Sequence, residues 1–158
     1  MRLQGGKQYL YAQWHGNDTI WRTIVDLNTA ILYATEDGAL DLRARARKIL
    51  TIGDMLIAGE KDGPLRPAPK PLGAVLGATN GVLFDYVFCK MTGFDMGLIP
   101  TIHQAARNDA LLCGGDIANV VLRSNVRDHD QKSLEALRFP PEWHFDPNPA
   151  WSEVLKRE

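Results

Sequence analysis

The chain has 158 residues, of which 45% are hydrophobic and 23% charged, a composition typical of one globular domain with a core of its own. Its 18 basic and 19 acidic residues leave a formal net charge of -1, which argues against binding to nucleic acid or to an anionic membrane surface. The sequence opens without the pattern of a secretion signal, and no apolar run approaches the roughly 20 residues of a membrane span, so we expect a cytoplasmic protein.

The chain contains two cysteines, Cys89 and Cys113, far apart and outside any CxxC or Cys/His spacing. Two thiols are too few for a structural zinc site or a thiolate-held iron–sulfur cluster. Cys89 stands among apolar residues, where a free cysteine behaves as a small buried hydrophobe. We therefore assign no cofactor from the sequence.

The first long element is a helix predicted over 19–34. Asp18 or Thr19 can cap its start, and apolar residues recur at helical spacing along it. A glycine at 38 ends the helix region, and residues 49–52 are predicted to form a short strand. We expect the helix to bury one apolar stripe, made up of Ile20, Ile24, Leu27 and Ile31.

The middle of the chain predicts a loop, a strand and a second helix. Four prolines lie between 64 and 71, and because proline donates no amide hydrogen bond, we expect an irregular loop over 59–73. Residues 73–78 are apolar and predict a buried strand, followed by an Asn80–Gly81 turn. An apolar helix then runs to Gly93. A strand, a turn and a helix in this order are typical of α/β domains.

A third helix is predicted over 100–106 and a short strand over 119–122. Prolines and aromatic residues then alternate, which favours an extended arm before a final short helix at 152–158. We therefore divide the chain into a lead segment at 1–13, one α/β domain at 14–138 and a Pro/aromatic C-terminal arm at 139–158.

The predicted fold class is α/β, a mixed sheet flanked by helices. Because a long helix comes almost immediately, before any central strand, we interpret the chain as the C-terminal part of a larger α/β domain. Besides the helix stripe, the predicted core includes Ile52, Val75, Leu76, Val87 and Met91.

The strings WHGNDTIWRTIVDLN and GEKDGP, followed by NGVLFD and an MTGFD-containing helix end, resemble the C-terminal half of the family known as domain of unknown function 362. The resemblance covers about 14–100. It implies an α/β fold, a partner half that carries further strands, and no particular activity. Asn80 stands where the family usually has an acid, whereas Asp85 keeps the second acidic position.

The start of the first helix is a candidate anion site. His15, Asn17 and Asp18 precede it, where unpaired backbone amides and the helix dipole favour a phosphate or carboxylate. Arg22 and Asp26 lie four residues apart on the same helix and either face a ligand or form a surface ion pair.

A second candidate is the acidic set Asp54, Glu60 and Asp62 around the GEKDGP loop. Carboxylates at such positions suit a hard cation, but they also form caps and turns, and we assign no metal. Asp85 is the sharpest single position because it interrupts an apolar helix, where a carboxylate is costly unless it caps the helix or faces a site.

Two classes of function stay open. In the first, the chain is an enzyme-type domain that binds a small anionic ligand or substrate. In the second, it is a non-catalytic binding or assembly module with a protein partner or a second copy, or a partial gene product. Convergence of Asn17, Arg22, Asp54, Asp62 and Asp85 in one cleft would favour the first class, and their dispersal the second.

Overall fold

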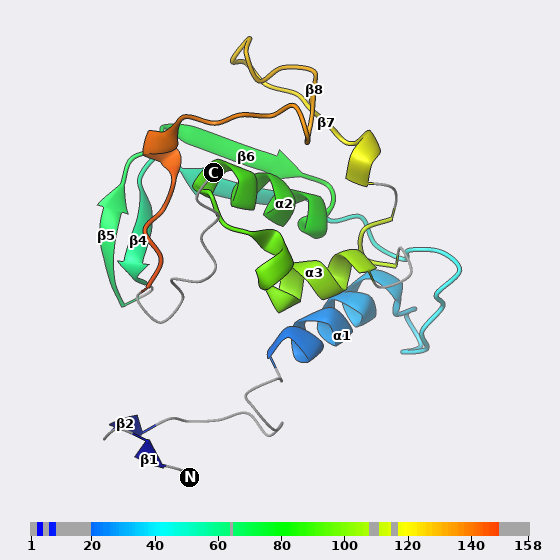
Figure 1. Cartoon of the computed structure of the whole chain (residues 1–158). Helices are drawn as coiled ribbons and strands as arrows, with labels where there is room; N and C mark the ends of the chain where they lie inside the picture. Colours follow the sequence, from blue (N-terminus) through cyan, green and yellow to red (C-terminus); the bar gives the residue numbers. More distant parts are fainter. Residues whose placement is uncertain are drawn as a thin grey trace.

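The computed structural model describes residues 3–4, 7–8, 20–63, 65–107, 111–114 and 117–148, and its fold is α/β (Figure 1). The helices are α1 (Ile20–Tyr33), α2 (Gly81–Thr92) and α3 (Pro100–Arg107). Three 3-10 turns cover Met96–Leu98, Ile117–Asn119 and Pro141–Trp143. The strands are β1 (Leu3–Gln4), β2 (Lys7–Gln8), β3 (Thr51–Met55), β4 (Ala58–Asp62), β5 (Arg66–Lys70), β6 (Ala74–Ala78), β7 (Val121–Leu122) and β8 (Lys132–Ser133).

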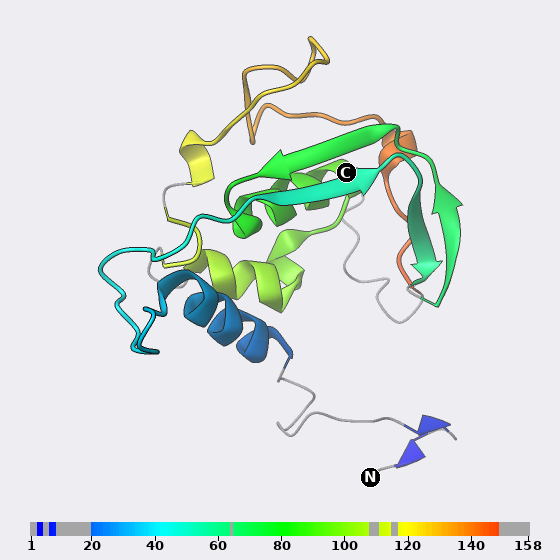
Figure 2. The same ribbon diagram turned by 180° about the vertical axis from the view of Figure 1, so that it is seen from behind.

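The central sheet consists of β3 and β6, which pair antiparallel with Thr51 opposite Ala78 and Met55 opposite Ala74. The other described strands form three further two-stranded antiparallel ladders. Helix α2 packs on one face of the β3–β6 sheet (Figure 1). Seen from behind, the opposite face has no described helix over it (Figure 2).

Two clusters of buried residues form the core. The larger lies between α2, the inner face of the sheet and the C-terminal arm, and it contains Met55, Leu72, Leu76, Val87, Met91, Leu134, Leu137 and Phe145. The smaller joins α1, α2 and α3, and it contains Val25, Leu32, Tyr33, Val82, Ala105, Leu112 and Cys113. The predicted core positions Leu76, Val87 and Met91 are confirmed as buried. The prediction for Ile52 and Val75 is wrong, because both lie on the outer face of the β3–β6 sheet and are exposed.

The predicted buried face of α1 is wrong. Ile20 and Leu27 are 60% and 56% exposed, and Ile24 and Ile31 are also exposed, whereas the helix buries Val25, Leu32 and Tyr33. The reason is that α1 carries apolar residues on two adjacent faces, and its main described contact is with α3. The periodicity predicts the helix itself, over 20–33, but does not decide which apolar face packs.

The predicted irregular loop over 59–73 is also wrong, because Ala58–Asp62 forms strand β4 and Arg66–Lys70 forms strand β5 against it. Pro67 and Pro69 are two residues apart, so their nitrogens point to the same side of the strand. A strand in a two-stranded ladder has one edge without a partner, and on that edge no amide donors are needed. The amides of Arg66, Ala68 and Lys70 point to the other edge, where they can bond to β4. Alternating prolines thus fit an edge strand.

The prediction of α2 is confirmed at both ends. Gly93 follows the helix with φ 77°, a left-handed conformation that favours glycine, and its amide donates to the Cys89 carbonyl. A side chain at this position would also collide with the His144 ring, since a Cβ atom would lie 2.9 Å from it. The helix therefore ends where the C-terminal arm crosses it.

The Pro/aromatic arm packs on the larger core cluster as far as the structure describes it. The Phe145 amide donates to the Thr92 carbonyl at 2.8 Å, and the Phe145 ring meets Phe88 edge-on with 6.0 Å between ring centroids. Phe139 and Trp143 stack on each other nearby. Trp151 and the predicted final helix lie outside the described residues.

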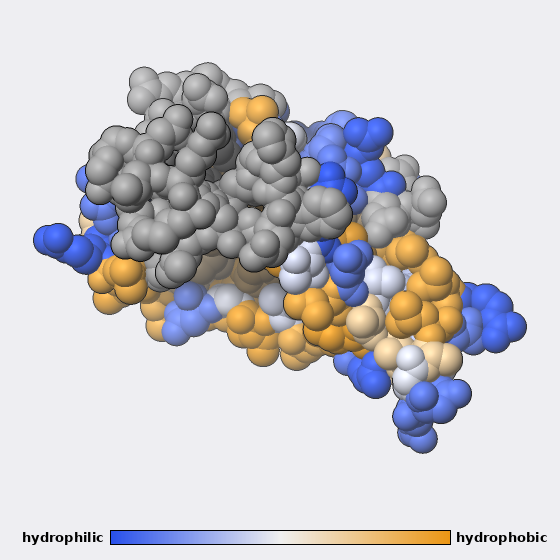
Figure 3. All heavy atoms as spheres, turned by 90° about the horizontal axis from the view of Figure 1, so that it is seen from below, coloured by the Kyte–Doolittle hydropathy of each residue, from blue (hydrophilic) through white to orange (hydrophobic). Residues whose placement is uncertain are grey.

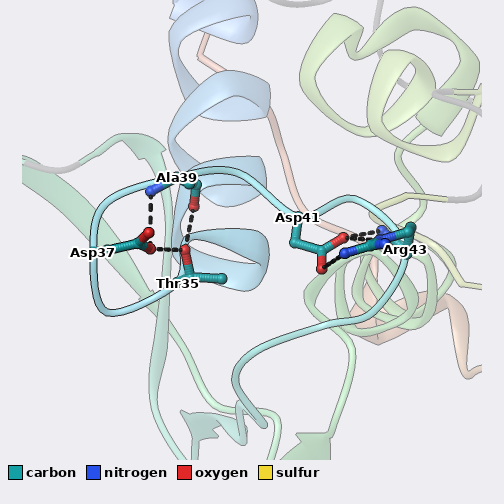
Figure 4. Close-up of polar contacts among 5 residues, drawn as sticks. All are labelled: Thr35, Asp37, Ala39, Asp41 and Arg43. Carbon is teal, nitrogen blue, oxygen red and sulfur yellow. Dashed lines mark hydrogen bonds and ion pairs between the residues drawn. The ribbon is translucent and has the colours of Figure 1, made fainter.

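The segment after α1 is held by local polar contacts (Figure 4). The Thr35 hydroxyl lies between the Asp37 carboxylate and the Ala39 carbonyl, and Arg43 forms a bidentate pair with Asp41. These bonds lower the pKa of Asp37, first through Thr35, and that of Asp41 through Arg43. Both acids are thus engaged in their own turns.

Candidate functional site

The junction between β6 and α2 is built around Asn80. Its Oδ1 accepts hydrogen bonds from the amides of Val82 and Leu83, which caps α2, and its Nδ2 donates to the carbonyls of Leu112 and Cys113 at 3.0 and 2.6 Å. An aspartate could accept from the same amides but could not donate to the carbonyls. Asparagine at this position therefore both starts the helix and ties it to the 111–114 segment.

A pocket of about 110 Å³ opens next to this junction, between α1, α2, α3 and the start of β3. Its apolar wall comes from the smaller core cluster and its neighbours. Its polar lining comes from five different parts of the chain, namely Asn28, Arg45, Thr51, the Thr79–Asn80 turn with Asp85, and Thr101. A concave site with a few convergent polar groups is the usual form of a ligand pocket.

Asp85 is the acid of this pocket. It lies in the second turn of α2, beyond the reach of a cap, and Asn80 already fills the capping role. The side chain is half-buried, and this burial raises the pKa of the carboxyl group. The hypothesis that Asp85 caps α2 is therefore wrong, and the hypothesis that it faces a site stays open.

Arg45 lies at the edge of the pocket but its guanidinium is already engaged. Its Nη2 donates to the carbonyls of Leu111 and Leu112 at 3.0 and 2.8 Å, and its Nε contacts the Tyr33 hydroxyl. The Tyr33 hydroxyl itself donates to the Leu111 carbonyl. Through the Tyr33 hydroxyl and the Leu111 and Leu112 carbonyls, Arg45 thus ties the end of α1 to the 111–114 segment.

The acids of the GEKDGP segment hold the C-terminal arm. Glu60 Oε2 accepts from the Asp146 amide at 2.8 Å and forms an ion pair with Lys70, and Asp62 Oδ1 accepts from Asn148 Nδ2 at 2.9 Å. Lys61 pairs with the Asp146 carboxylate. These residues belong to strand β4, and their contacts hold the C-terminal arm, a structural role that neither the metal nor the turn hypothesis predicted.

The remaining described candidates lie apart from this pocket. Asp54 is on the exposed face of β3 and accepts a hydrogen bond from the Leu56 amide, which shapes the turn into β4. Arg22 and Asp26 are exposed on α1, and the Arg22 guanidinium stacks 4.2 Å from the centre of the Trp21 ring. Arg22, Asp54, Asp62 and Asp85 are dispersed.

The anion site proposed for the start of the first helix cannot be placed, because His15, Asn17 and Asp18 lie outside the described residues. Among the residues that are described, no group of three or more His, Cys, Asp or Glu side chains could hold a metal ion. The pocket residues Asn28, Thr51, Thr79 and Thr101 were not predicted, because no local motif marks them and only tertiary packing brings them together.

Both thiols are buried, as expected for Cys89. Burial, with the negative charges of Asp85 and Asp95, raises the pKa of Cys89 to about 12. A thiol in this state is not a nucleophile at neutral pH. Cysteine chemistry therefore has no support in this region.

The described part of the chain also exposes many apolar side chains. On the uncovered face of the central sheet, Ile52 and Val75 are 66% and 63% exposed, with Leu50 beside them, and the exposed stripe of α1 adds four more aliphatic side chains. Seen from below, hydrophobic residues form a broad band between hydrophilic edges (Figure 3). Large exposed apolar patches are common where proteins bind other macromolecules.

A scan against protein-family models, a search of curated proteins and a search of solved structures each found no match for this chain. In the part of the chain that the structure describes, no helix combines the length and apolarity that crossing a membrane requires.

Proposed function

We propose that this chain is a non-catalytic assembly module of the α/β class, whose central sheet is extended and covered by a second polypeptide segment, in the same protein or in a partner. The observation that carries the proposal is the uncovered face of the β3–β6 sheet, with Ile52 and Val75 exposed. The dispersal of Arg22, Asp54 and Asp62 away from the Asp85 pocket argues against the anionic-ligand hypothesis.

The sheet itself supports a missing neighbour. Isolated two-stranded sheets are marginal in water. An antiparallel sheet that leaves one face in water usually carries polar side chains on that face. Here α2 covers one face, while the other places Ile52 and Val75 in water. Helix α1 likewise buries one apolar stripe and exposes a second. This second stripe offers another face on which a further polypeptide segment could pack.

The free edge of β6 supports a strand as the neighbour. A groove of about 550 Å³ runs along β6, and its far wall is the segment 120–123. Leu83, Phe84 and Val87 of α2 contribute to its lining. Among the described strands β6 pairs with β3 alone, so its second edge offers backbone donors and acceptors to a strand laid in this groove.

The resemblance to the C-terminal half of the domain of unknown function 362 family agrees with this proposal, since that resemblance implies a second half with further strands. Under the proposal the chain corresponds to one part of such an α/β domain and works in the cytosol. The partner is a polypeptide, and neither nucleic acid nor membrane is needed.

The test replaces Ile52 and Val75 together by lysine. Both side chains already contact water, so we expect the variant to fold, while two charges prevent docking. We expect the wild type to bind an apolar dye and to associate with rising concentration in light-scattering measurements, and the double variant to lose both properties. Leu65→Lys is the matched control, because Leu65 is 91% exposed but belongs to the turn between β4 and β5.

A photo-crosslinking residue placed at position 52 in cells supplies the second readout. We expect crosslinks from position 52 to map to a defined segment of one polypeptide, and none from position 65. A wild type that stays monomeric, binds no dye and gives the same crosslinks at both positions would contradict the proposal.

A further inference from the structure

The pocket beside α1 holds a carboxylate without a partner. Asp85 has no hydrogen bond or ion pair among the described residues, although it is half-buried between α2 and the pocket lining. Leaving a carboxylate in such a place costs stability, and proteins retain such costs mainly at functional sites. Asp85 therefore needs an explanation that the fold does not supply, since Asn80 is the cap of α2.

The groups around Asp85 are rich in acceptors. Asn28 uses its Nδ2 to bond the Ile24 carbonyl, which leaves its Oδ1 as an acceptor, and Thr51, Thr79 and Thr101, which each carry a hydroxyl, line the same pocket. The one cationic side chain in the lining, Arg45, donates to the carbonyls of Leu111 and Leu112 instead. Among the described residues, no cationic side chain thus forms an ion pair with Asp85.

The size and charge of the pocket limit its ligand. A volume of about 110 Å³ is small, since pockets for drug-sized ligands measure about 300–1,000 Å³. A divalent cation needs several oxygen ligands, and a single carboxylate is a poor start for such a shell. An anion would meet the Asp85 carboxylate directly. A compact cation that carries N–H donors satisfies the acceptors and fits the volume.

We propose that this pocket binds a small primary ammonium group, with the Asp85 carboxylate as its ion-pair partner and the Asn28 side-chain carbonyl and Thr101 hydroxyl as further acceptors. The apolar wall, which includes Ile102 and Val82, contacts the carbon attached to the nitrogen. This site is independent of the docking surface on the sheet, and either proposal can fail without the other.

The experiment is an amide NMR titration of the full chain with methylammonium chloride at fixed ionic strength. We expect shifts concentrated on the amides around the pocket, such as those of Thr79, Val82 and Ile102. Asp85→Asn keeps the shape of the side chain and removes its charge, and we expect it to weaken binding by about tenfold or more. Asp26→Asn, an exposed carboxylate on α1, is the control and should change the Kd less than about twofold.

Two additional measurements separate a specific site from general charge attraction. Tetramethylammonium has the same charge but no N–H donor, so we expect it to produce no shifts at the pocket. Thr101→Val, a second variant that leaves Asp85 in place, should weaken methylammonium binding by a few-fold. The proposal is overturned if the shifts lie outside the pocket, if folded Asp85→Asn binds as tightly as the wild type, or if both cations bind alike.

Discussion

The two long apolar helices of this chain are used in opposite ways. Helix α2 buries Val82, Val87, Cys89, Met91 and Thr92 between the sheet, α3 and the C-terminal arm. Helix α1 buries Val25, Leu32 and Tyr33 but leaves its longest apolar stripe in water. Since both sequences are apolar, the difference lies in how many neighbours each helix has. No described element packs on the exposed apolar stripe of α1, whereas α2 has neighbours on most of its faces.

The largest effect should come from the core of α2. Met91→Ala should lower the free energy of unfolding by about 2–5 kcal/mol, because Met91 is only 4% exposed and its removal leaves a cavity. Leu27→Ala on the exposed stripe of α1 should cost less than about 0.5 kcal/mol. Urea denaturation at low protein concentration measures both. Equal losses would mean that the α1 stripe is covered in solution.

The comparison extends to the asparagines of the two helices. Asn80→Asp removes two donated hydrogen bonds and places a carboxylate against the Leu112 and Cys113 carbonyls, so we expect a loss of about 1–3 kcal/mol. Asn28→Asp on α1 removes one exposed bond within its own helix and should cost a few tenths of a kcal/mol. Thermal unfolding of the two variants tests this difference. A neutral Asn80→Asp would show that the helix junction does not depend on the donated bonds.

The two faces of the sheet can be compared with glycine substitutions. A Cβ atom on Gly53, on the inner face, would lie 2.5 Å from the Phe84 ring, whereas on Gly77, on the outer face, the nearest atom is 3.9 Å away. We expect Gly53→Ala to cost about 1 kcal/mol, since the half-buried ring can shift, and Gly77→Ala to be close to neutral. Chemical denaturation measures both. A larger loss at Gly77 would mean that the outer face is occupied.

The smallest effect concerns pH. Burial raises the pKa of Asp85 in the folded state, so the folded protein holds this proton more tightly than the unfolded chain. Its contribution to stability is therefore present below the unfolded pKa and is lost as pH rises through the folded pKa. We expect Asp85→Asn to be more stable than the wild type at neutral pH and to show no such loss. A stability difference that is the same from acid to neutral pH would contradict this assignment.

The sequence predicted features that one local interaction decides. Asn80 and Gly93 mark the ends of α2 because a cap and a left-handed glycine act within a few residues. Features that depend on distant partners could not be predicted. The exposed stripe of α1 has the same periodicity as a buried one, and Pro67 and Pro69 exclude a strand only when the strand has two neighbours.

The candidate site divides in the same way. Asp85 could be singled out from the sequence, because a carboxylate within an apolar helix is anomalous wherever the helix packs. Its surroundings could not, since Asn28, Thr51 and Thr101 are ordinary residues until α1, β3 and α3 meet. Glu60 and Asp62 each bond to a residue more than eighty positions away, so their role in holding the C-terminal arm could not be predicted from the local sequence.

The hydrogen bonds between the β4–β5 hairpin and the C-terminal arm also affect the order of folding. Glu60 and Asp62 bond to residues 86 positions later, and contacts of such long sequence separation form slowly because a large loop must close first. During synthesis the hairpin leaves the ribosome long before Phe145 does. The larger cluster therefore stays open on that side until the arm arrives, and a newly made chain is most vulnerable to aggregation in this interval.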